Sequence, residues 1–213
     1  ARWFSRAVNA LSAEELSPIL NLGSGTSSYR LAGAHSAFFS TLKKAGIVAI
    51  HTDIEAGEGV DVAGDIFSEH LVNELVARVP SSLICANILE HVERPLDLAD
   101  ICSSLLGPGG YLFASVPKFY PYHPAPIDTM YRPNPEELSR LFPDFDVLKS
   151  EVVVCRSLFK QCCNEPVVGL RVLASLVLGL VSFNKPRVRK ELERIRYIMR
   201  PLLVSAVVLR KRN

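Results

Sequence analysis

Residues 18–27 read PILNLGSGTS, an apolar run that ends in a glycine-rich turn. The run has the length of a buried strand, and Gly23 and Gly25 let the backbone turn sharply after it. A helical pattern then continues to Ala45, and Gly46 suits the position just past a helix end. This order of strand, glycine turn and helix predicts the first unit of a parallel α/β sheet.

The same alternation of strand and helix continues along the first half of the chain. Strands are predicted at residues 47–52, 60–63, 82–86 and 111–116, and helices at 69–79 and 95–106. Their continuous apolar runs favour a sheet that is covered on both faces. Two later runs, 145–154 and 202–209, suit an antiparallel pair of strands at the sheet edge. The pattern therefore predicts a doubly wound, mostly parallel sheet of seven strands.

The second half of the chain carries two segments of a different kind. Residues 117–135 contain six prolines and His123, so we expect a stiff loop that caps the substrate. Residues 166–200 are helical in pattern, and we predict a helical insertion between the last two strands. Within it, residues 167–183 are almost all apolar but contain Arg171, and their length is at the lower limit for a membrane span. A buried or interfacial helix is therefore the prediction.

Composition limits the domain organisation and the partners. A length of 213 residues with 48% hydrophobic side chains suits one domain over residues 1–213. Residues 185–213 carry ten Lys or Arg and two Glu, a net charge of +8, which leaves −6 for the rest because the total is +2. Residues 167–200 could therefore contact an anionic membrane surface. A solvated helix face, packing over the active site or a homodimer interface are the alternatives.

Cysteine usage indicates a reducing compartment. The five cysteines are odd in number, none forms a CxxC pair, and Cys85 and Cys102 lie in apolar runs. The adjacent Cys162 and Cys163 could react or bind a metal, but a loop or core position is the simpler interpretation. The first residues lack the apolar core of a signal peptide. We expect a cytoplasmic protein, peripheral to a membrane if residues 167–200 bind one.

Polar and glycine residues follow each of the first four strands. In a parallel sheet, ligands bind beyond the carboxyl ends of the strands, where Gly23 and Gly25 fall. Asp53 follows the second strand and could accept hydrogen bonds from both hydroxyls of a ribose. Residues 64–66, GDI, follow the third, and residues 87–92, NILEHV, follow the fourth. Each alone also fits a tight turn or a helix cap, but the ordered set favours a nucleotide-like ligand.

These motifs resemble those of class I S-adenosylmethionine (SAM)-dependent methyltransferases. Residues 19–27 are similar to the first motif of that superfamily, and Asp53 and Asp65 match its ribose and adenine positions. Residues 89–92, LEHV, and 106–112, LGPGGYL, resemble a subgroup that includes ubiquinone-biosynthesis and glycan methyltransferases. The resemblance covers roughly residues 15–155 and the last strand. It implies a Rossmann-like α/β sheet, SAM as cofactor and S-adenosylhomocysteine as product. The implied cofactor-binding residues are Asn21, Gly23, Ser24, Gly25, Asp53, Ile54, Asp65, Ile66 and Asn87.

The sequence departs from the superfamily pattern at several positions. Asn21 replaces the usual acid at the end of the first strand, and Ser27 replaces the third glycine of GxGxG. Some methyltransferases of this branch bind a divalent metal through Glu-x-x-Glu-His. Here Asn87 takes the place of the first Glu, although Glu90 and His91 remain. We therefore predict no metal site.

The implied cofactor determines the chemistry that the remaining residues must support. A methyl group on a sulfonium is already activated, so catalysis consists largely of alignment and exclusion of water. A hydroxyl acceptor also needs a base, and His91 and His123 are the candidates, because imidazole titrates near neutral pH. A cap for His91 and a rigid loop position for His123 are the alternatives. Predicted substrate residues are Glu90, Tyr122, Asp128 and Tyr131.

The predicted reaction is methyl transfer to a hydroxyl of a small molecule, glycan or glycolipid. The glycan preference rests on residues 120–124, YPYHP, and 131–135, YRPNP, which resemble a segment of surface-polysaccharide methyltransferases. A degenerate SAM-binding module with a basic interaction arm is one alternative. A nicotinamide-dependent oxidoreductase is another, but Ser28 replaces the glycine of a dinucleotide motif. Nucleic acid is a disfavoured partner, because no RNA-binding aromatic motif accompanies the basic residues.

Overall fold

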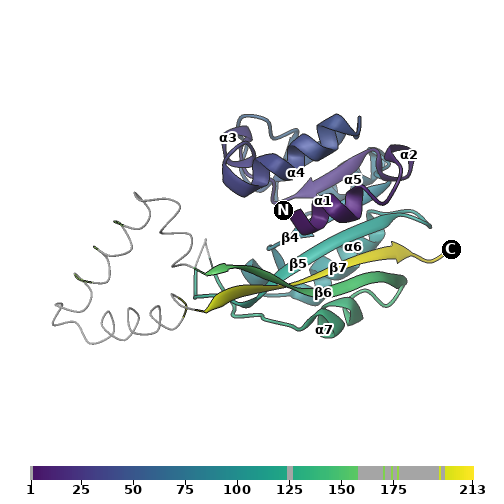
Figure 1. Ribbon diagram of the computed structural model, residues 1–213. Coiled ribbons are helices and arrows are strands. Elements are labelled where there is room, and N and C mark those ends of the chain that lie inside the picture. Colours follow the sequence, from purple (N-terminus) through teal and green to yellow (C-terminus); the bar gives the residue numbers. More distant parts are fainter. Residues whose placement is uncertain are drawn as a thin grey trace.

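The computed structural model describes residues 2–123, 127–157 and 200–213, and single positions 170, 174, 177 and 197. Within them lies a seven-stranded sheet in the order β3-β2-β1-β4-β5-β7-β6 (Figure 1). The strands are β1 (Ile19–Leu22), β2 (Ala49–Asp53), β3 (Val62–Ala63), β4 (Ser82–Ala86), β5 (Tyr111–Phe119), β6 (Phe145–Ser157) and β7 (Pro201–Lys211). The first five run parallel, and β7 is antiparallel to both β5 and β6. The predicted fold class, including its antiparallel last pair, is confirmed.

Helices cover both faces of the sheet, so its strands are apolar on both sides. Leu83 and Cys85 of β4 pack in one core cluster with residues of α5 and α6, while Ile84 between them packs in a second cluster with residues of α1 and α4. The helices are α1 (Arg2–Val8), α2 (Ala13–Leu16), α3 (Ser27–Arg30), α4 (Gly33–Lys44), α5 (Glu69–Ala77), α6 (Pro95–Ser104) and α7 (Pro135–Arg140). This two-sided burial explains the continuous apolar runs.

Strand β5 is longer than the sequence pattern indicates. It continues to Phe119, three residues beyond the predicted end, and these residues belong to the segment that was expected to be a loop. Pairing between β4 and β5 ends at Ala86 and Ser115, so Pro117 lies beside β7 alone. A proline that lacks an N–H is tolerated where one side of the strand has no partner. The connection between sheet and α7 therefore begins at Tyr120.

The predicted helical insertion at residues 166–200 lies outside the described residues, apart from Leu170, Ala174, Val177 and Tyr197, each helical, and Arg200. The membrane contact predicted for residues 167–200 likewise lies outside them. Among the residues that the structure does describe, no helix is both long and apolar enough to cross a bilayer. Buried positions for Cys85 and Cys102 match the expectation.

Candidate functional site

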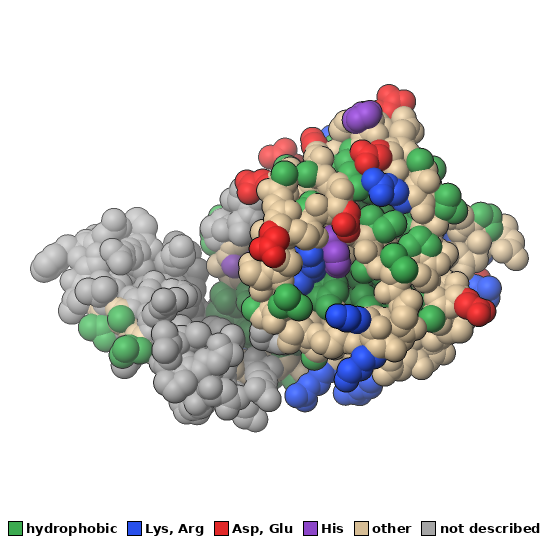
Figure 2. Space-filling model, turned by 90° about the horizontal axis from the view of Figure 1, so that it is seen from above, with side chains coloured by type: hydrophobic (Ala, Val, Ile, Leu, Met, Phe, Trp, Pro, Cys, Tyr) green, Lys and Arg blue, Asp and Glu red, His purple; other side chains and the backbone are tan. Residues whose placement is uncertain are grey.

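A cavity of about 540 Å³ lies at the carboxyl ends of β1 to β4. Its size suits a small molecule or a cofactor. Figure 2 shows histidine, acidic and basic side chains together in a hollowed part of one face. Seven of the predicted site residues line the cavity: Gly23, Asp53, Ile54, Asp65, Ile66, Asn87 and His91. The sheet thus brings together side chains from four separate strand ends, as the sequence predicts.

The turn after β1 requires glycine at two positions. Gly23 and Gly25 have φ values of +57° and +61°, in the left-handed region that other residues seldom adopt. A Cβ on Gly25 would also lie 2.7 Å from Cδ1 of Tyr29. Asp53, at the end of β2, fixes this turn, because its Oδ2 accepts a hydrogen bond of 2.7 Å from the Gly25 N–H. The residue predicted to bind a ribose therefore also holds the glycine turn.

Arg30 is a second support of the turn, and sequence reasoning did not find it. Its guanidinium is buried and donates to Ser24 Oγ at 3.2 Å, to the Gly25 carbonyl at 2.5 Å and to the Gly59 carbonyl at 2.6 Å. Burial lowers the pKa of Arg30, although the negative charges of Asp61 and Asp53 counteract this. An arginine on the short helix after a glycine turn ordinarily indicates a solvated side chain, so no sequence signal predicted this role.

Asn21 and Ser24 lie behind the cavity wall and not on it. The Asn21 amide is 3.3 Å from His51 Nδ1. Burial, and then the nearby charge of Arg30, lower the pKa of His51 to about 4 despite the opposing effect of Asp61. The imidazole is therefore neutral and can accept the hydrogen bond from Asn21. The contact of Asn21 with His51 joins β1 to β2, while Ser24 Oγ donates to the Gly25 carbonyl at 3.0 Å within the turn.

The residues after β3 combine two roles that the sequence left as alternatives. Asp65 Oδ1 accepts a hydrogen bond of 3.0 Å from the Phe67 N–H, as a turn residue would. Asp65 and Ile66 nevertheless both line the cavity, together with Ile54, which is 71% exposed at its rim. Asn87 reaches the wall from the end of β4 with a φ of +55°. Apolar and acidic groups thus face the same space, which suits an adenosine-like ligand.

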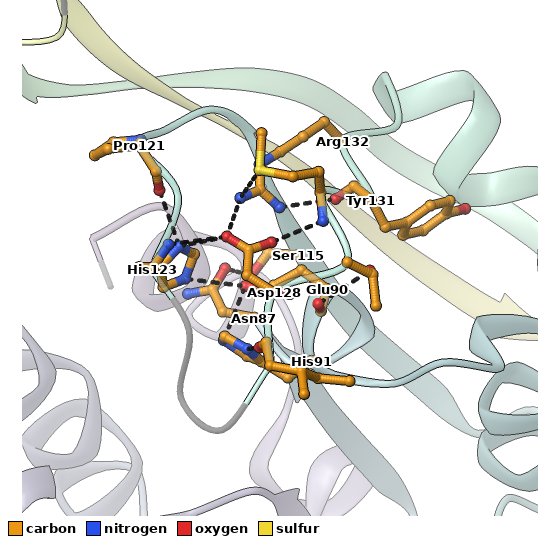
Figure 3. Close-up of polar contacts among 12 residues, drawn as sticks. Asn87, Glu90, His91, Ser115, Pro121, His123, Asp128, Tyr131 and Arg132 are labelled. Atoms are coloured by element: carbon orange, nitrogen blue, oxygen red, sulfur yellow. Dashed lines mark hydrogen bonds and ion pairs between the residues drawn. The ribbon is translucent and has the colours of Figure 1, made fainter. Parts of the chain in front are cut away.

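A cluster of four polar side chains lies beside the cavity and joins two distant parts of the chain. Glu90 and His91 belong to the 3-10 turn η1 (Leu89–His91) after β4, and His123 and Asp128 come from the segment after β5 (Figure 3). His91 Nε2 is 3.7 Å from Glu90 Oε1, and His123 Nε2 is 4.0 Å from the same oxygen. The rings of the two histidines are 5.0 Å apart, edge to face. Of the catalytic and substrate residues predicted from sequence, these four come together.

Asp128 is held in this cluster by several hydrogen bonds. It accepts hydrogen bonds from Arg132 at 2.6 Å and from the backbone N–H groups of His123 and Met130, and its Oδ2 lies 3.1 Å from His123 Nδ1. Burial alone would raise the pKa of Asp128, but the hydrogen bonds from Arg132 and the two N–H groups lower it to about 2. Asp128 is therefore a permanent anion that orients His123 and Arg132.

Glu90 differs from Asp128 in having no such support. Its side chain is 0% exposed, and neither carboxylate oxygen has a hydrogen-bond partner among the described residues. Burial raises the pKa of Glu90 to about 7, although its own backbone N–H and the charges of His91 and Arg132 lower it in part. The Glu90 backbone carbonyl, in contrast, accepts from both the N–H and the hydroxyl of Thr129. The carboxylate thus lies between two histidines, buried and without a donor.

The two tyrosines predicted to orient substrate do not join this cluster. Tyr122 is 51% exposed, and Tyr131 packs against the apolar core. Burial raises the pKa of the Tyr131 hydroxyl, and the charge of Glu137 adds to this effect. Neither tyrosine lines the cavity. Their roles as substrate residues stay predictions.

No family model matches the sequence. Two curated relatives are ubiquinone biosynthesis O-methyltransferases. The one from Ralstonia nicotianae is 36% identical over 87 residues, which is 39% of this chain and 34% of the relative. The one from Paraburkholderia xenovorans is 30% identical over 105 residues, 46% of this chain and 43% of the relative. The matches therefore span less than half of the length of either relative.

Solved structures resemble the whole chain at low sequence identity. A SAM-dependent methyltransferase from Archaeoglobus fulgidus has a TM-score of 0.53 and 15% identity, with 97% of this chain and 90% of the other covered. A methyltransferase of unproven activity from Bacillus halodurans has a TM-score of 0.55 and 12% identity, with 98% and 97% covered. A cyclase has a TM-score of 0.55 and 14% identity, with 98% and 80% covered.

The fold of the chain is that of the SAM-dependent methyltransferases among these structures. The similarity to a cyclase shows that this fold also supports other chemistry, so the reaction has to be argued from the site.

Proposed function

We propose that this protein is a SAM-dependent methyltransferase that methylates a hydroxyl oxygen of a small molecule. The observation that carries the proposal is the cavity at the carboxyl ends of β1 to β4, with Asp53 and the glycine turn on its wall. When bound, SAM supplies a methyl group that is already activated for transfer. The chain must then bind the cofactor, align an acceptor and remove its proton.

The cavity wall offers suitable contacts for each part of the cofactor. Oδ1 of Asp53 is not used by the glycine turn, whose N–H bonds to Oδ2, and so can accept from a ribose hydroxyl. Asp65 can accept from an adenine amino group, and Ile54 and Ile66 can cover the ring. The backbone at Gly23 lets a ligand approach closely, because no Cβ is present there.

The acceptor would bind on the side of the cavity where His91 lies. His91 lines the cavity and belongs to the cluster of Glu90, His123 and Asp128. A neutral imidazole there can take the proton of an acceptor hydroxyl, and Asp128 would stabilise the resulting charge on His123. The curated relatives are O-methyltransferases, which supports a hydroxyl acceptor. A glycan or glycolipid acceptor stays a narrower prediction within this class.

Calorimetric titration of the purified protein with SAM, S-adenosylhomocysteine and NADH tests the cofactor. We expect micromolar binding of the first two and a loss of at least about 10-fold in affinity for Asp53→Asn, because the variant lacks the negative charge that strengthens hydrogen bonds from ribose hydroxyls. Asp100→Asn, at an exposed position on α6, is the matched control. Failure of the folded protein to bind SAM and S-adenosylhomocysteine would refute the proposal, and NADH binding would point to an oxidoreductase.

Transfer of a labelled methyl group from SAM to a panel of phenolic and sugar hydroxyls tests the reaction. The expected product is heavier by one CH₂ and carries the label on oxygen. His91→Asn and His123→Asn should each slow the reaction by about 10²-fold or more if they act as bases. Cofactor binding without transfer to any acceptor would favour the alternative of a SAM-binding module with no methyltransferase activity.

A further inference from the structure

The residue directly after β4, Asn87, is held at the cavity wall by its backbone. Its φ of +55° lies in the left-handed region, which asparagine adopts more readily than most other residues. The Asn87 N–H donates to the Ser115 carbonyl at 2.8 Å, which ties this position to the neighbouring strand β5. Asn87 and His91 both line the cavity. The backbone therefore presents the Asn87 side chain to whatever binds there.

A hydrogen bond from Ser115 determines which end of the Asn87 amide is free. The hydroxyl of the buried Ser115 donates to Asn87 Oδ1 at 3.3 Å (Figure 3). The amide nitrogen Nδ2 has no hydrogen-bond acceptor in the part of the chain that the structure describes. Asn87 is exposed and lines the cavity, so the two N–H groups of Nδ2 can donate to a ligand there.

His91 supplies the opposite kind of group on the same wall. Its Nδ1 is 2.5 Å from the Ile127 carbonyl, which can only accept a hydrogen bond. Nδ1 must therefore carry the proton of the neutral ring, and the lone pair lies on Nε2. The distance of 3.7 Å from Nε2 to the Glu90 carboxyl is too long for a hydrogen bond. The wall thus offers a proton acceptor on His91 and a hydrogen-bond donor on Asn87.

An amide at position 87 suits an ionised oxygen better than a carboxylate would. A carboxylate would repel such an oxygen, whereas the N–H groups of Asn87 donate to it and carry no net charge. The carboxyl groups of the neighbouring cluster do not line the cavity, because Glu90 is fully buried and Asp128 is paired with Arg132 at 2.6 Å. Glu93 does line the cavity but is exposed to solvent.

We propose that Asn87 Nδ2 donates a hydrogen bond to the acceptor oxygen in the proposed methyl transfer and stabilises that oxygen as an anion. The inference rests on the proposed function, because it assigns a residue to the acceptor of that reaction. His91 Nε2 takes the proton of the hydroxyl, the oxygen forms the bond to the methyl carbon, and the electron pair of the broken carbon–sulfur bond stays on the sulfur. Ser115 is a positioning residue, because it acts on the acceptor only through Asn87.

Binding of 4-nitrophenol tests this role of Asn87 without any methyl transfer. The ionised phenol has a visible absorption band that the neutral phenol lacks, so the spectrum reports the charge of the bound oxygen. Titrations are made with and without S-adenosylhomocysteine, at a pH near the pKa of the free probe. We expect the bound probe to be more ionised than the free probe, because Asn87 donates to the phenolate oxygen.

Two variants remove the donor and keep a residue that tolerates the backbone of position 87. Asn87→Gly and Asn87→Asp both suit a positive φ, and each should weaken binding of the ionised probe at least about 10-fold. The loss should be larger for Asn87→Asp, because its charge repels the phenolate. Asn73→Asp, at an exposed position on α5, is the matched control and should leave binding unchanged.

The role of Ser115 is tested by combining substitutions. Ser115→Ala keeps the carbonyl that accepts from the Asn87 N–H but frees the amide to rotate, so a loss of about 3-fold is expected. The double variant Ser115→Ala and Asn87→Gly should bind the probe no more weakly than Asn87→Gly alone, because Ser115 acts through the missing amide. Additive losses would show that the contribution of Ser115 is merely structural.

Three outcomes would overturn the proposal, with circular dichroism as the check on folding. One is that the folded protein binds no probe or does not favour its ionised form. Another is an unchanged preference in Asn87→Asp, which would mean that the amide oxygen faces the cavity. The third is a loss of S-adenosylhomocysteine affinity in Asn87→Gly as large as the loss for the probe, which would assign the side chain to the cofactor. Absence of methyl transfer with the probe results intact would refute the proposed function alone.

Discussion

The two sides of the candidate site differ in how completely their polar groups are paired. Around the glycine turn, Asp53 and Arg30 pair with backbone groups of Gly25 and Gly59. Beside the cavity, the Glu90 carboxylate is fully buried and yet has no hydrogen-bond donor among the described residues. The first region is held together by its own hydrogen bonds, whereas the second contains a buried acid that its described neighbours do not pair. The two regions can be tested separately.

Arg30→Ala should have the largest effect on stability, because it removes a buried guanidinium together with the three hydrogen bonds that it donates. We expect the free energy of unfolding to fall by about 3 kcal/mol or more, together with cofactor affinity. Urea denaturation and calorimetry measure the two quantities. Arg78→Ala, which breaks only the exposed pair with Glu74, should cost at most about 0.5 kcal/mol. Equal costs for the two variants would mean that Arg30 does not organise the turn.

Glu90→Gln should stabilise the protein at alkaline pH. The folded-state pKa of about 7 lies above the model value of 4.5, so the folded protein holds this proton more tightly than the unfolded chain. The proton on Glu90 therefore contributes to the free energy of unfolding. This contribution is complete below about pH 4.5, is lost as the pH rises through 7, and amounts to about 3 kcal/mol at most.

Urea denaturation from pH 5 to pH 8 in the presence of a chelator measures this effect. The free energy of unfolding of Glu90→Gln should rise relative to that of the unsubstituted protein as the pH rises. Glu74→Gln, on the exposed face of α5, should show no such change. A pH-independent difference would show that the Glu90 carboxyl does not change its charge in this range, which would weaken the contrast between the two regions.

Gly25→Ala should destabilise the protein more than Gly46→Ala. Both glycines have positive φ, +61° and +73°, but a Cβ on Gly25 would clash with Tyr29, whereas nothing lies within 4 Å of one on Gly46. We expect costs of about 2–3 and about 1 kcal/mol, respectively, in thermal denaturation. Cofactor affinity should fall only for Gly25→Ala. Similar costs would indicate that Tyr29 moves aside easily.

Thr129→Val should have the smallest effect. It removes the hydroxyl that donates to the Glu90 carbonyl at 3.1 Å but keeps the backbone N–H bond of 2.9 Å to the same atom. A loss of about 0.5–1 kcal/mol in urea denaturation is expected. A much larger loss would show that the Thr129 hydroxyl, and not the N–H, holds the segment after β5 against η1.

The sequence predicted the first region well and the second only in part. Gly23, Gly25 and Asp53 could be placed because each follows a strand, and parallel strands end at one edge of the sheet. His91 and His123 were predicted as catalytic residues, but their common approach to Glu90 depends on contacts between residues 36 to 39 positions apart. The contacts of Arg30 and the pairing of Asn21 with His51 were not predicted either, because each joins separate parts of the chain. Local patterns carry no information about such pairings.

The last two strands give the protein a further property. Ser157 and Pro201 are paired opposite each other, so the chain leaves and re-enters the sheet at one fixed point, near Phe119 at the end of β5. The cost of closing a loop between two fixed ends grows only slowly with its length. The register of β6 and β7 is therefore set by their own backbone pairing and by the pairing of β7 with β5, and not by the length of chain that joins Ser157 to Pro201.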